Sequence, residues 1–436
     1  MNELNLANHS VGSIGANTTD ILLSGTNLWE NFYSNTVRVI LRSFISIILI
    51  IYATSVYAAL ASPLKKVPGP WYAPLFDLHL RYLFAKGTIW KYVQEQHRRH
   101  GPVIRLGPKQ VWVSDKKAMK DVLATTDLPK VSMYAEISRD RQSPGLFGEI
   151  MDESAFGRGF GLINSICNQT LLKTRQDREW AAIPDAIFKG QATRYKAISN
   201  LIDERRQSGI RQSDPPKQDI LQHMLDEGNR PDTGVQMNSR EIIDQMSELL
   251  LAGSETTSGT IACLFLELAR NPNVKRKLLA SLPVLDENDA ILSSKTIRED
   301  PTYCYLEACI KENLRKHPIA SEMGRRTMGK PHYIDDYIIP PFTVVSASYR
   351  DLHLNEKYWP DPDRFWPERW LDGEEREGAP EPDLEAYYPF SAGKHSCIGQ
   401  NFAYAEMRTE SANICTLFDV EEVANKSLDF RQFITM

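Results

Sequence analysis

The sequence predicts a mainly helical protein with small β-sheets, preceded by one transmembrane helix. Three patterns support this fold class: an uncharged, mostly aliphatic run at residues 44–60, an alternation of polar and apolar residues at 101–113, and a helical apolar pattern at 238–270. We expect residues 1–66 to form an N-terminal tail with its anchor and residues 67–436 to form one globular domain.

The apolar run at residues 44–60 is just long enough to span a bilayer. A buried core helix and a secretory signal peptide are the alternatives. Mostly polar residues precede the run for about forty positions and no basic segment starts the chain, which disfavours a signal peptide. We therefore expect an uncleaved membrane anchor. Arg38 and Arg42 before it balance Lys65 and Lys66 after it, so charge leaves its orientation open.

Shorter elements follow the anchor. Residues 90–97 have the pattern of a first helix, and the alternation at 101–108 and 110–113 predicts a β-hairpin. A further helix is expected to include residues 118–123, and a later strand and turn to lie at 337–345. These assignments give the domain its mixture of helices and small sheets.

The longest predicted element is a helix of roughly 32 residues, or about 48 Å at 1.5 Å per residue. Asn238 and Glu241 have the spacing of a capping box, and the helical pattern stops at Asn271, before a proline. Within it, the segment Ala252-Gly253-Ser254-Glu255-Thr256-Thr257 places a glycine and two β-branched residues among good helix formers. Because such residues weaken a helix, we expect a local distortion there.

A second helix is predicted at residues 305–315, where Glu312 and Arg315 lie one turn apart. Such a pair is ordinarily a solvated ion pair worth a few tenths of a kcal/mol. By itself, this spacing indicates helix surface. The segment Phe365-Trp366-Pro367-Glu368-Arg369-Trp370 follows later in the chain.

One cysteine near the C-terminus lies in the segment Phe390-Ser391-Ala392-Gly393-Lys394-His395-Ser396-Cys397-Ile398-Gly399. A thiolate can be an axial ligand of a flat cofactor only where its backbone comes close to the cofactor face. Glycine permits such an approach and also permits positive φ, so Gly393 and Gly399 meet that need. Taken alone, a free cysteine is more often a small buried hydrophobic residue.

This segment resembles the Phe-x-x-Gly-x-Arg-x-Cys-x-Gly signature of the cytochrome P450 family, the haem-thiolate monooxygenases. The resemblance implies that Cys397 is the axial ligand of the haem iron and that Phe390, Gly393 and Gly399 bind the cofactor. His395 stands where the family has an arginine that pairs with a haem propionate. Because histidine is often uncharged near neutral pH, we expect a weaker contact from His395.

Residues 252–257 resemble the motif of the helix that crosses the oxygen-binding face of the haem in this family. The resemblance implies that Thr256 is a hydrogen-bond partner of dioxygen. It also implies that Glu255 belongs to the proton supply. These two residues are the expected catalytic residues.

Glu312, Arg315 and Arg369 resemble the family's Glu-x-x-Arg and Pro-Glu-Arg-Phe motifs. The resemblance implies a buried structural charge triad that fixes the loop carrying Cys397. Between these segments, Arg326 matches an arginine that reaches a haem propionate, although Arg325 is adjacent.

Composition restricts the function only slightly. A net charge of −5 gives no hint of nucleic-acid binding, and the six cysteines have neither paired spacing nor the density of a disulfide scaffold. The glycines at 157–161 lack the spacing of a nucleotide-binding loop, so a flexible turn is the better interpretation. We therefore expect the nicotinamide cofactor to bind a partner protein.

The resemblance implies a monooxygenase that inserts one atom of O2 into a lipophilic organic substrate, with haem b (iron protoporphyrin IX) as its cofactor. Electrons would come from NADPH through NADPH–cytochrome P450 reductase, with cytochrome b5 as an optional second partner. Pro68-Gly69-Pro70 resembles the hinge of microsomal members, which implies a single-pass protein of the endoplasmic reticulum membrane, in contact with membrane lipid, whose catalytic domain faces the cytosol. Asn8 and Asn17 would then be lumenal glycosylation sites. The expected setting is secondary metabolism.

The resemblance is incomplete in two places. After Ile150 the family continues into a basic helix that holds a haem propionate, but Met151 begins sequence typical of a later region. The chain also ends at Met436, where members add a terminal hairpin. A catalytically impaired, haem-poor variant is therefore one alternative. A haem-thiolate isomerase or dehydratase is another, although Glu255 and Thr256 argue against it.

Overall fold

The computed structural model describes residues 18–130, 196, 198–207, 219–227, 234–283 and 292–422, with side chains from Val37 onward. The chain forms two compact units, Met1–Ala61 and Ser62–Met436. This boundary is slightly earlier than the one expected after residue 66, because the short 3-10 helix η1 (Pro63–Lys66) belongs to the second unit. The sequons at Asn8 and Asn17, the turn at 157–161, the break after Ile150 and the C-terminal end lie outside the described residues.

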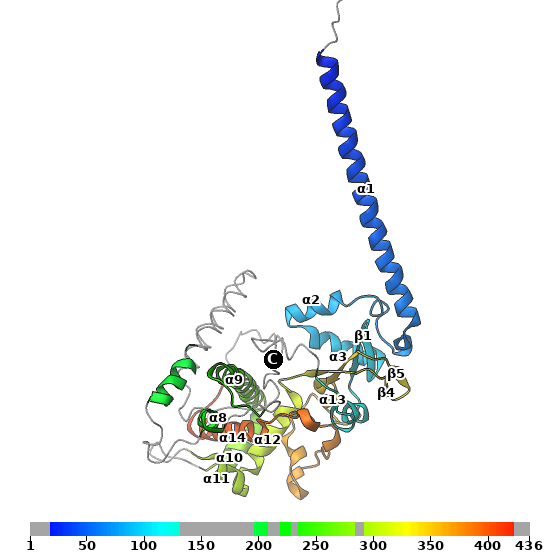
Figure 1. The fold of residues 1–436 in the computed structure, drawn as a ribbon. Helices are drawn as coiled ribbons and strands as arrows, with labels where there is room; N and C mark the ends of the chain where they lie inside the picture. Colours follow the sequence, from blue (N-terminus) through cyan, green and yellow to red (C-terminus); the bar gives the residue numbers. More distant parts are fainter. Residues whose placement is uncertain are drawn as a thin grey trace, which may run out of the picture. The chain divides into compact units, whose positions relative to one another are not determined.

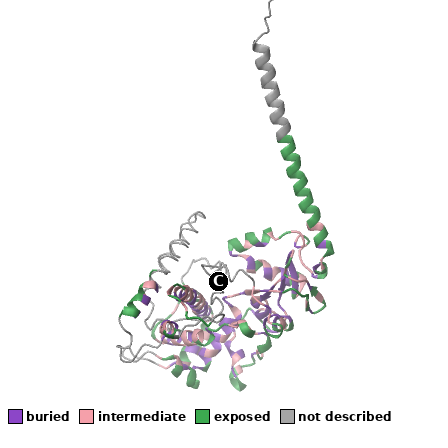
Figure 2. Cartoon of the chain, in the orientation of Figure 1, coloured by how far each residue is buried: buried purple, intermediate pink, exposed green. Residues whose placement is uncertain are grey.

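The first unit contains one long helix, α1 (Thr18–Ala61), of 44 residues. Its part Val37–Ala61 could cross a membrane by its length of 25 residues and its mean hydropathy of 2.2. Almost all side chains of that part are exposed (Figure 2). The candidate span is longer than the expected 44–60 because it includes Arg38 and Arg42, whose long side chains can extend toward the membrane surface.

The second unit contains two small sheets. The first has the strand order β1-β2-β6-β3, and the second pairs β4 with β5. The strands are β1 Val103–Gly107, β2 Gln110–Val113, β3 Glu322–Arg326, β4 His332–Ile334, β5 Tyr337–Ile339 and β6 Val344–Ser348. β1 and β2 form the predicted antiparallel hairpin, β2 pairs in parallel with β6, and β3 is antiparallel to β6. The strand and turn expected at 337–345 are the two strands β5 and β6 with a turn between them.

In Figure 1, helices α8 to α12 and α14 gather together, and α2, α3 and α13 lie beside the strands. The α-helices are α2 Leu78–Lys86, α3 Ile89–His100, α4 Lys116–Lys120, α8 Ile220–Glu227, α9 Ser239–Arg270, α10 Pro272–Ser281, α11 Ser294–Glu299, α12 Cys304–Lys316, α13 Tyr349–His353 and α14 Gln400–Leu417. The remaining turns are the π-helical η2 Asp121–Thr125 and the 3-10 helices η5 Pro301–Tyr303, η6 Pro367–Trp370, η7 Gly373–Arg376, η8 Leu384–Ala386 and η9 Gly393–His395. The helix expected at 118–123 is therefore divided between α4 and η2. The predicted fold class, mainly helical with small sheets, is confirmed.

Helix α9 begins and ends where the sequence predicts. Asn238 and Glu241 form the complete capping box, and the helix has 32 residues. The distortion expected at 252–257 is wrong, because α9 is a continuous α-helix through this segment. The cost of one glycine in a helix, about 1 kcal/mol, is small beside the packing of α9 against α8, α10, α12 and α14. That packing also identifies α9 as a core helix, although its length and composition would allow it to cross a membrane.

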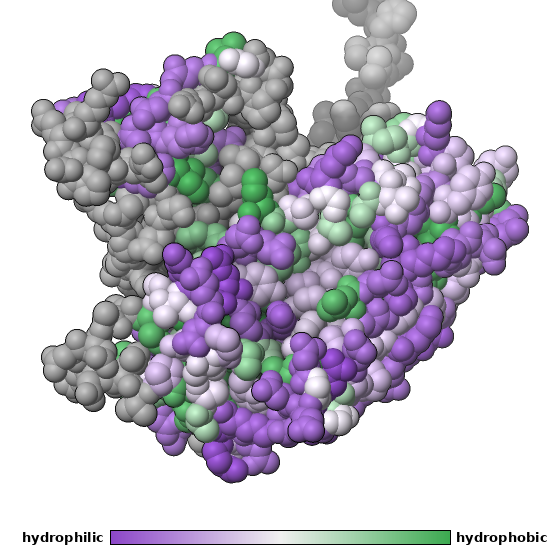
Figure 3. Space-filling model, turned by 90° about the horizontal axis from the view of Figure 1, so that it is seen from below, coloured by the Kyte–Doolittle hydropathy of each residue, from purple (hydrophilic) through white to green (hydrophobic). Residues whose placement is uncertain are grey.

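The second unit buries apolar side chains in several clusters. One surrounds the first sheet and includes Val111 and Trp359, and another joins α12 to α14 and includes Leu306 and Met407. The face shown in Figure 3 is mainly hydrophilic, with apolar residues singly or in small groups. The cysteine segment contacts both clusters, because Ala392 packs against the first and Phe390 packs against the second.

Candidate functional site

We call residues 390–399 the cysteine loop. Cys397 lies between η9 and α14 and is exposed as a residue. Its backbone N–H donates to the carbonyl oxygen of Phe390 at 2.8 Å, which closes the loop. Surrounding protein atoms raise the pKa of the thiol, while a backbone hydrogen bond from Gly399 and the charge of Lys130 partly oppose that rise. A bound cationic metal would reverse this balance, since metal-ligating thiols are deprotonated.

Glycine is required at position 393 for two reasons. Its φ is +75°, and a Cβ there would lie 2.1 Å from the carbonyl oxygen of Leu123 in η2. The close neighbour is therefore protein backbone, which sequence reasoning did not foresee. Gly399 has φ of −76°, so the argument from positive φ applies to Gly393 alone. Asp127, just after η2, also accepts a hydrogen bond from the backbone N–H of Lys394 at 3.3 Å.

The other loop residues lie as follows. The Phe390 ring packs on Tyr404 of α14, with centroids 5.3 Å apart. His395 is half-buried at the end of η9. Ser391 holds φ of +62° and accepts a hydrogen bond from the Tyr349 hydroxyl at 2.9 Å. The loop is thus fixed from α13, α14 and η2.

The structure brings Glu312, Arg315 and Arg369 together in the interior. Arg315 donates two hydrogen bonds to Glu312: one from Nε to Oε2 at 2.9 Å and one from Nη2 to Oε1 at 2.8 Å. The Nε of Arg369 lies 3.5 Å from Oε1 of Glu312. All three side chains are at most 1% exposed. Burial lowers the pKa of Arg369, and the charge of Glu312 opposes this effect.

Two tryptophans complete the surroundings of Glu312, and sequence reasoning missed them. The backbone N–H of Trp366 donates to Oε1 and the indole N–H of Trp370 donates to Oε2, both at 3.0 Å. Arg315 also donates to the carbonyl oxygens of His353 and Pro362, at 2.9 and 2.8 Å. The carboxylate and the guanidinium are therefore almost fully hydrogen-bonded, as buried charges require.

Adjacent arginines of β3 face opposite sides of the sheet. Arg325 is fully buried, and its Nη1 donates to the carbonyl oxygen of Leu128 at 3.2 Å. Arg326 is half-buried, and its guanidinium lies 5.5 Å from the ring of the half-exposed Phe342. Arg325 also pairs through its backbone with Lys130, whose charge acts on Cys397. The structure thus encloses Arg325 in the interior and leaves the expected Arg326 accessible.

Thr256 and Glu255 lie half-buried in α9. The Thr256 hydroxyl donates to the carbonyl oxygen of Ala252 at 2.7 Å, within the helix. Its lone pairs can still accept a hydrogen bond. α9 packs on α14, which begins directly after the cysteine loop, so the two motifs occupy neighbouring elements.

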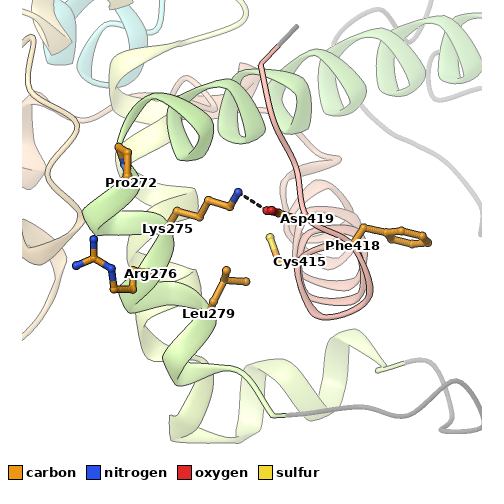
Figure 4. Close-up of a pocket in the computed structure, with 7 residues that line it drawn as sticks. All are labelled: Pro272, Lys275, Arg276, Leu279, Cys415, Phe418 and Asp419. Carbon is orange, nitrogen blue, oxygen red and sulfur yellow. Dashed lines mark hydrogen bonds and ion pairs between the residues drawn. The ribbon is translucent and has the colours of Figure 1, made fainter.

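A hollow of about 300 Å³ lies away from these residues, between α10 and the end of α14 (Figure 4). Lys275 forms an ion pair with Asp419 at its rim, and Cys415 lies at its floor. None of the residues assigned to a site from the sequence lines this hollow.

The donor set of the cysteine loop fits an iron already held by a macrocycle. Among the described residues, no group of three or more His, Cys, Asp or Glu side chains could hold a bare metal ion. A single exposed thiol on a rigid loop is instead suited to one axial position, with the remaining positions supplied by the macrocycle. The half-buried, accessible guanidinium of Arg326 suits a carboxylate of such a group.

Comparisons with known proteins agree with this arrangement. Residues 181–433, more than half of the chain, match the family model described as Cytochrome P450. The chain is 26% identical to cytochrome P450 monooxygenase acrD of Aspergillus aculeatus, over 84% of this chain and 87% of that protein. It is 24% identical to cytochrome P450 monooxygenase LUC2 of a Fusarium species, over 88% of this chain and 89% of that protein. It is 32% identical to cyclooctat-9-en-7-ol 5-monooxygenase of Streptomyces melanosporofaciens, over 55% of this chain and 49% of that protein.

Proposed function

Because the chain belongs to the cytochrome P450 family, and its relatives named above are monooxygenases, we propose that it is a membrane-anchored haem-thiolate monooxygenase of a lipophilic substrate. The observation that carries this proposal is the exposed Cys397 on a loop fixed by the close packing of Gly393 and by contacts from α13 and α14. When bound, haem b supplies the activation of O2 that inserts one oxygen atom into the substrate. The chain's own residues would bind the haem, orient it and deliver protons.

We assign the haem contacts as follows. Cys397 would provide the thiolate ligand of the haem iron, and Phe390, Gly393 and Gly399 would shape its loop. His395 would contact one propionate, as its position in the motif implies. We assign the second propionate contact to Arg326, because its half-buried guanidinium is accessible, whereas Arg325 is fully enclosed and donates to the carbonyl oxygen of Leu128.

The charge triad has a structural role in this proposal. Glu312 is anchored in α12, and Arg369 belongs to η6, so their contact joins two segments far apart in the chain. Arg315 extends the connection to the carbonyl oxygens of His353 and Pro362. The network thereby holds the region before the cysteine loop in one arrangement without touching the cofactor.

Thr256 and Glu255 are the proposed catalytic residues. Thr256 directs its proton to Ala252 and keeps lone pairs available to accept a hydrogen bond on the active-site side of α9. Glu255, directly before Thr256 in the same helix, would supply protons. Both assignments rest on the family motif and on the packing of α9 against α14.

The anchor supports the proposed location and partners. Val37–Ala61 would hold the chain in the endoplasmic reticulum membrane with the catalytic unit in the cytosol. There, NADPH–cytochrome P450 reductase would deliver electrons, with cytochrome b5 as an optional donor. A membrane location also favours a lipophilic substrate, which suits a role in secondary metabolism.

The ferrous–CO absorption spectrum of the full-length protein tests this function. The wild-type chain should give the Soret band typical of thiolate ligation, and Cys397→Ser should abolish it because a serine hydroxyl is a poor electron donor to iron. Cys415→Ser is the matched control, since Cys415 is a buried cysteine remote from the loop. Retention of the band in Cys397→Ser, or its loss in Cys415→Ser alone, would show that the ligand is misassigned.

A haem-poor variant is the second candidate, and one comparison favours it. The match to acrD runs over 449 aligned positions but covers only 84% of this chain of 436 residues, so that relative carries segments that this chain lacks. A missing propionate contact typically weakens binding by about 1.5–3 kcal/mol, or roughly ten- to a hundredfold and somewhat more. Low haem occupancy that recovers when a basic helix from a close relative is inserted after Ile150 would support this candidate.

A further inference from the structure

We propose that His353 is a positioning residue that couples the charge triad to the cysteine loop. This role deepens the proposed function and rests on it, because the loop matters only if Cys397 is the haem ligand. His353 is the last residue of α13 and is fully buried. It touches no reacting atom and acts through the backbone on either side of it.

His353 connects the two features through two hydrogen bonds. Its carbonyl oxygen accepts Nη1 of Arg315 at 2.9 Å, so the residue is held directly by the triad. Its ring Nε2 accepts the backbone N–H of Tyr388 at 2.8 Å. Tyr388 lies two positions before the cysteine loop. It belongs to no helix or strand, so secondary structure provides no other acceptor for its N–H.

The contact at Tyr388 continues into the loop. The carbonyl oxygen of Tyr388 accepts a hydrogen bond from the backbone N–H of Ser391 at 3.2 Å. The Ser391 hydroxyl oxygen accepts a hydrogen bond from the hydroxyl group of Tyr349. The loop then closes with the Cys397 N–H on Phe390. A series of hydrogen bonds therefore runs from Arg315 through His353 to the turn that presents the cysteine.

The imidazole can perform this role only in its neutral form, because a protonated ring has no acceptor. Burial, and then the charge of Arg315, lower the pKa of His353 to about 3. Since Nε2 accepts, the proton lies on Nδ1, for which the described residues offer no hydrogen-bond partner. The ring of Tyr387, 5.5 Å away between centroids, packs beside the imidazole and limits its movement.

Two substitutions distinguish the effect of the hydrogen-bond acceptor of His353 from the effect of its ring. His353→Gln keeps an acceptor oxygen at the same number of bonds from Cβ as Nε2, whereas His353→Phe keeps a ring but removes the acceptor. Loss of the acceptor leaves the Tyr388 N–H unsatisfied, at about 1–3 kcal/mol. Amide hydrogen exchange of the full-length protein as purified, resolved to residues 388–397, should therefore accelerate about 5- to 150-fold in His353→Phe. In His353→Gln it should stay within a fewfold of wild type.

His97→Phe is the matched control, since His97 is also a buried neutral histidine but bonds to Gly101 and Ser348. It should leave exchange at 388–397 unchanged relative to the rest of the protein. Unchanged exchange in His353→Phe, or equal acceleration in both His353 variants, would overturn the coupling. With haem bound, His353→Phe should also lower the fraction with the thiolate-type ferrous–CO band, and His353→Gln should restore it. If the wild type gave no such band while the exchange pattern held, the proposed function would fail and the coupling would stand.

Discussion

Replacement of Glu312 by glutamine tests a fully buried charge. The two carboxylate oxygens accept four hydrogen bonds: two donors meet Oε2, from Arg315 and Trp370, and two meet Oε1, from Arg315 and the Trp366 backbone. A glutamine of the same shape has one acceptor oxygen and one NH2 group. In either orientation, the NH2 group would face two donors, and both guanidinium groups would lose their counter-charge.

The expected loss of stability follows from these contacts. Two lost hydrogen bonds to a charged group, at about 1.5–3 kcal/mol each, agree with the roughly 3–5 kcal/mol typical of breaking a buried ion pair. That loss is a large part of the total stability of a typical domain, about 5–15 kcal/mol. Urea unfolding of the detergent-solubilised protein, followed by tryptophan fluorescence, should show the midpoint fall while the slope stays constant.

Glu95→Gln provides the matched control. Glu95 pairs with Arg99 at 2.6 Å, but both side chains are largely exposed, so its loss should cost less than about 1 kcal/mol. A free energy of unfolding for Glu312→Gln that equals the value for Glu95→Gln would refute the argument that the triad stabilises the fold.

Three further substitutions test single features of the protein. Gly393→Ala should lower the free energy of unfolding by more than Gly378→Ala, because both have φ near +75° and only Gly393 has a backbone atom in the place of the new Cβ; equal losses would contradict that contact. Thr256→Ala should keep the haem but lower the product formed per NADPH consumed, and unchanged coupling would make Thr256 an ordinary helix residue. Burial raises the pKa of Asp351 to about 7, above its value of about 3.9 in an unfolded chain. The folded state therefore binds more protons, and the contribution of this residue to stability declines as pH rises from about 4 to 7. The free energy of unfolding, measured from about pH 4 to 7, should therefore decline less in Asp351→Asn than in the wild type. An identical pH profile in the two proteins would exclude Asp351 as the source of the decline.

Local sequence signals determined the elements that depend on nearest neighbours. The capping box at Asn238 and the proline after Asn271 set both ends of α9, and alternation gave the β1–β2 hairpin, because caps, breakers and periodicity act within a few residues. The spacing around Cys397 likewise indicated the site and the family. The expected distortion of α9 was wrong because packing against neighbouring helices outweighs a local propensity of about 1 kcal/mol.

Only the tertiary structure decided which side chains meet. The sequence could not show which of Arg325 and Arg326 is buried, because the pleat of β3 turns adjacent residues to opposite faces and distant segments decide which face is interior. It also gave no sign that η2 crowds Gly393 or that His353 joins Arg315 to Tyr388. These contacts link positions far apart in the chain, and their energies come from burial and desolvation. A motif identifies a candidate ligand such as Cys397, but the folded chain fixes the surroundings that hold it in place.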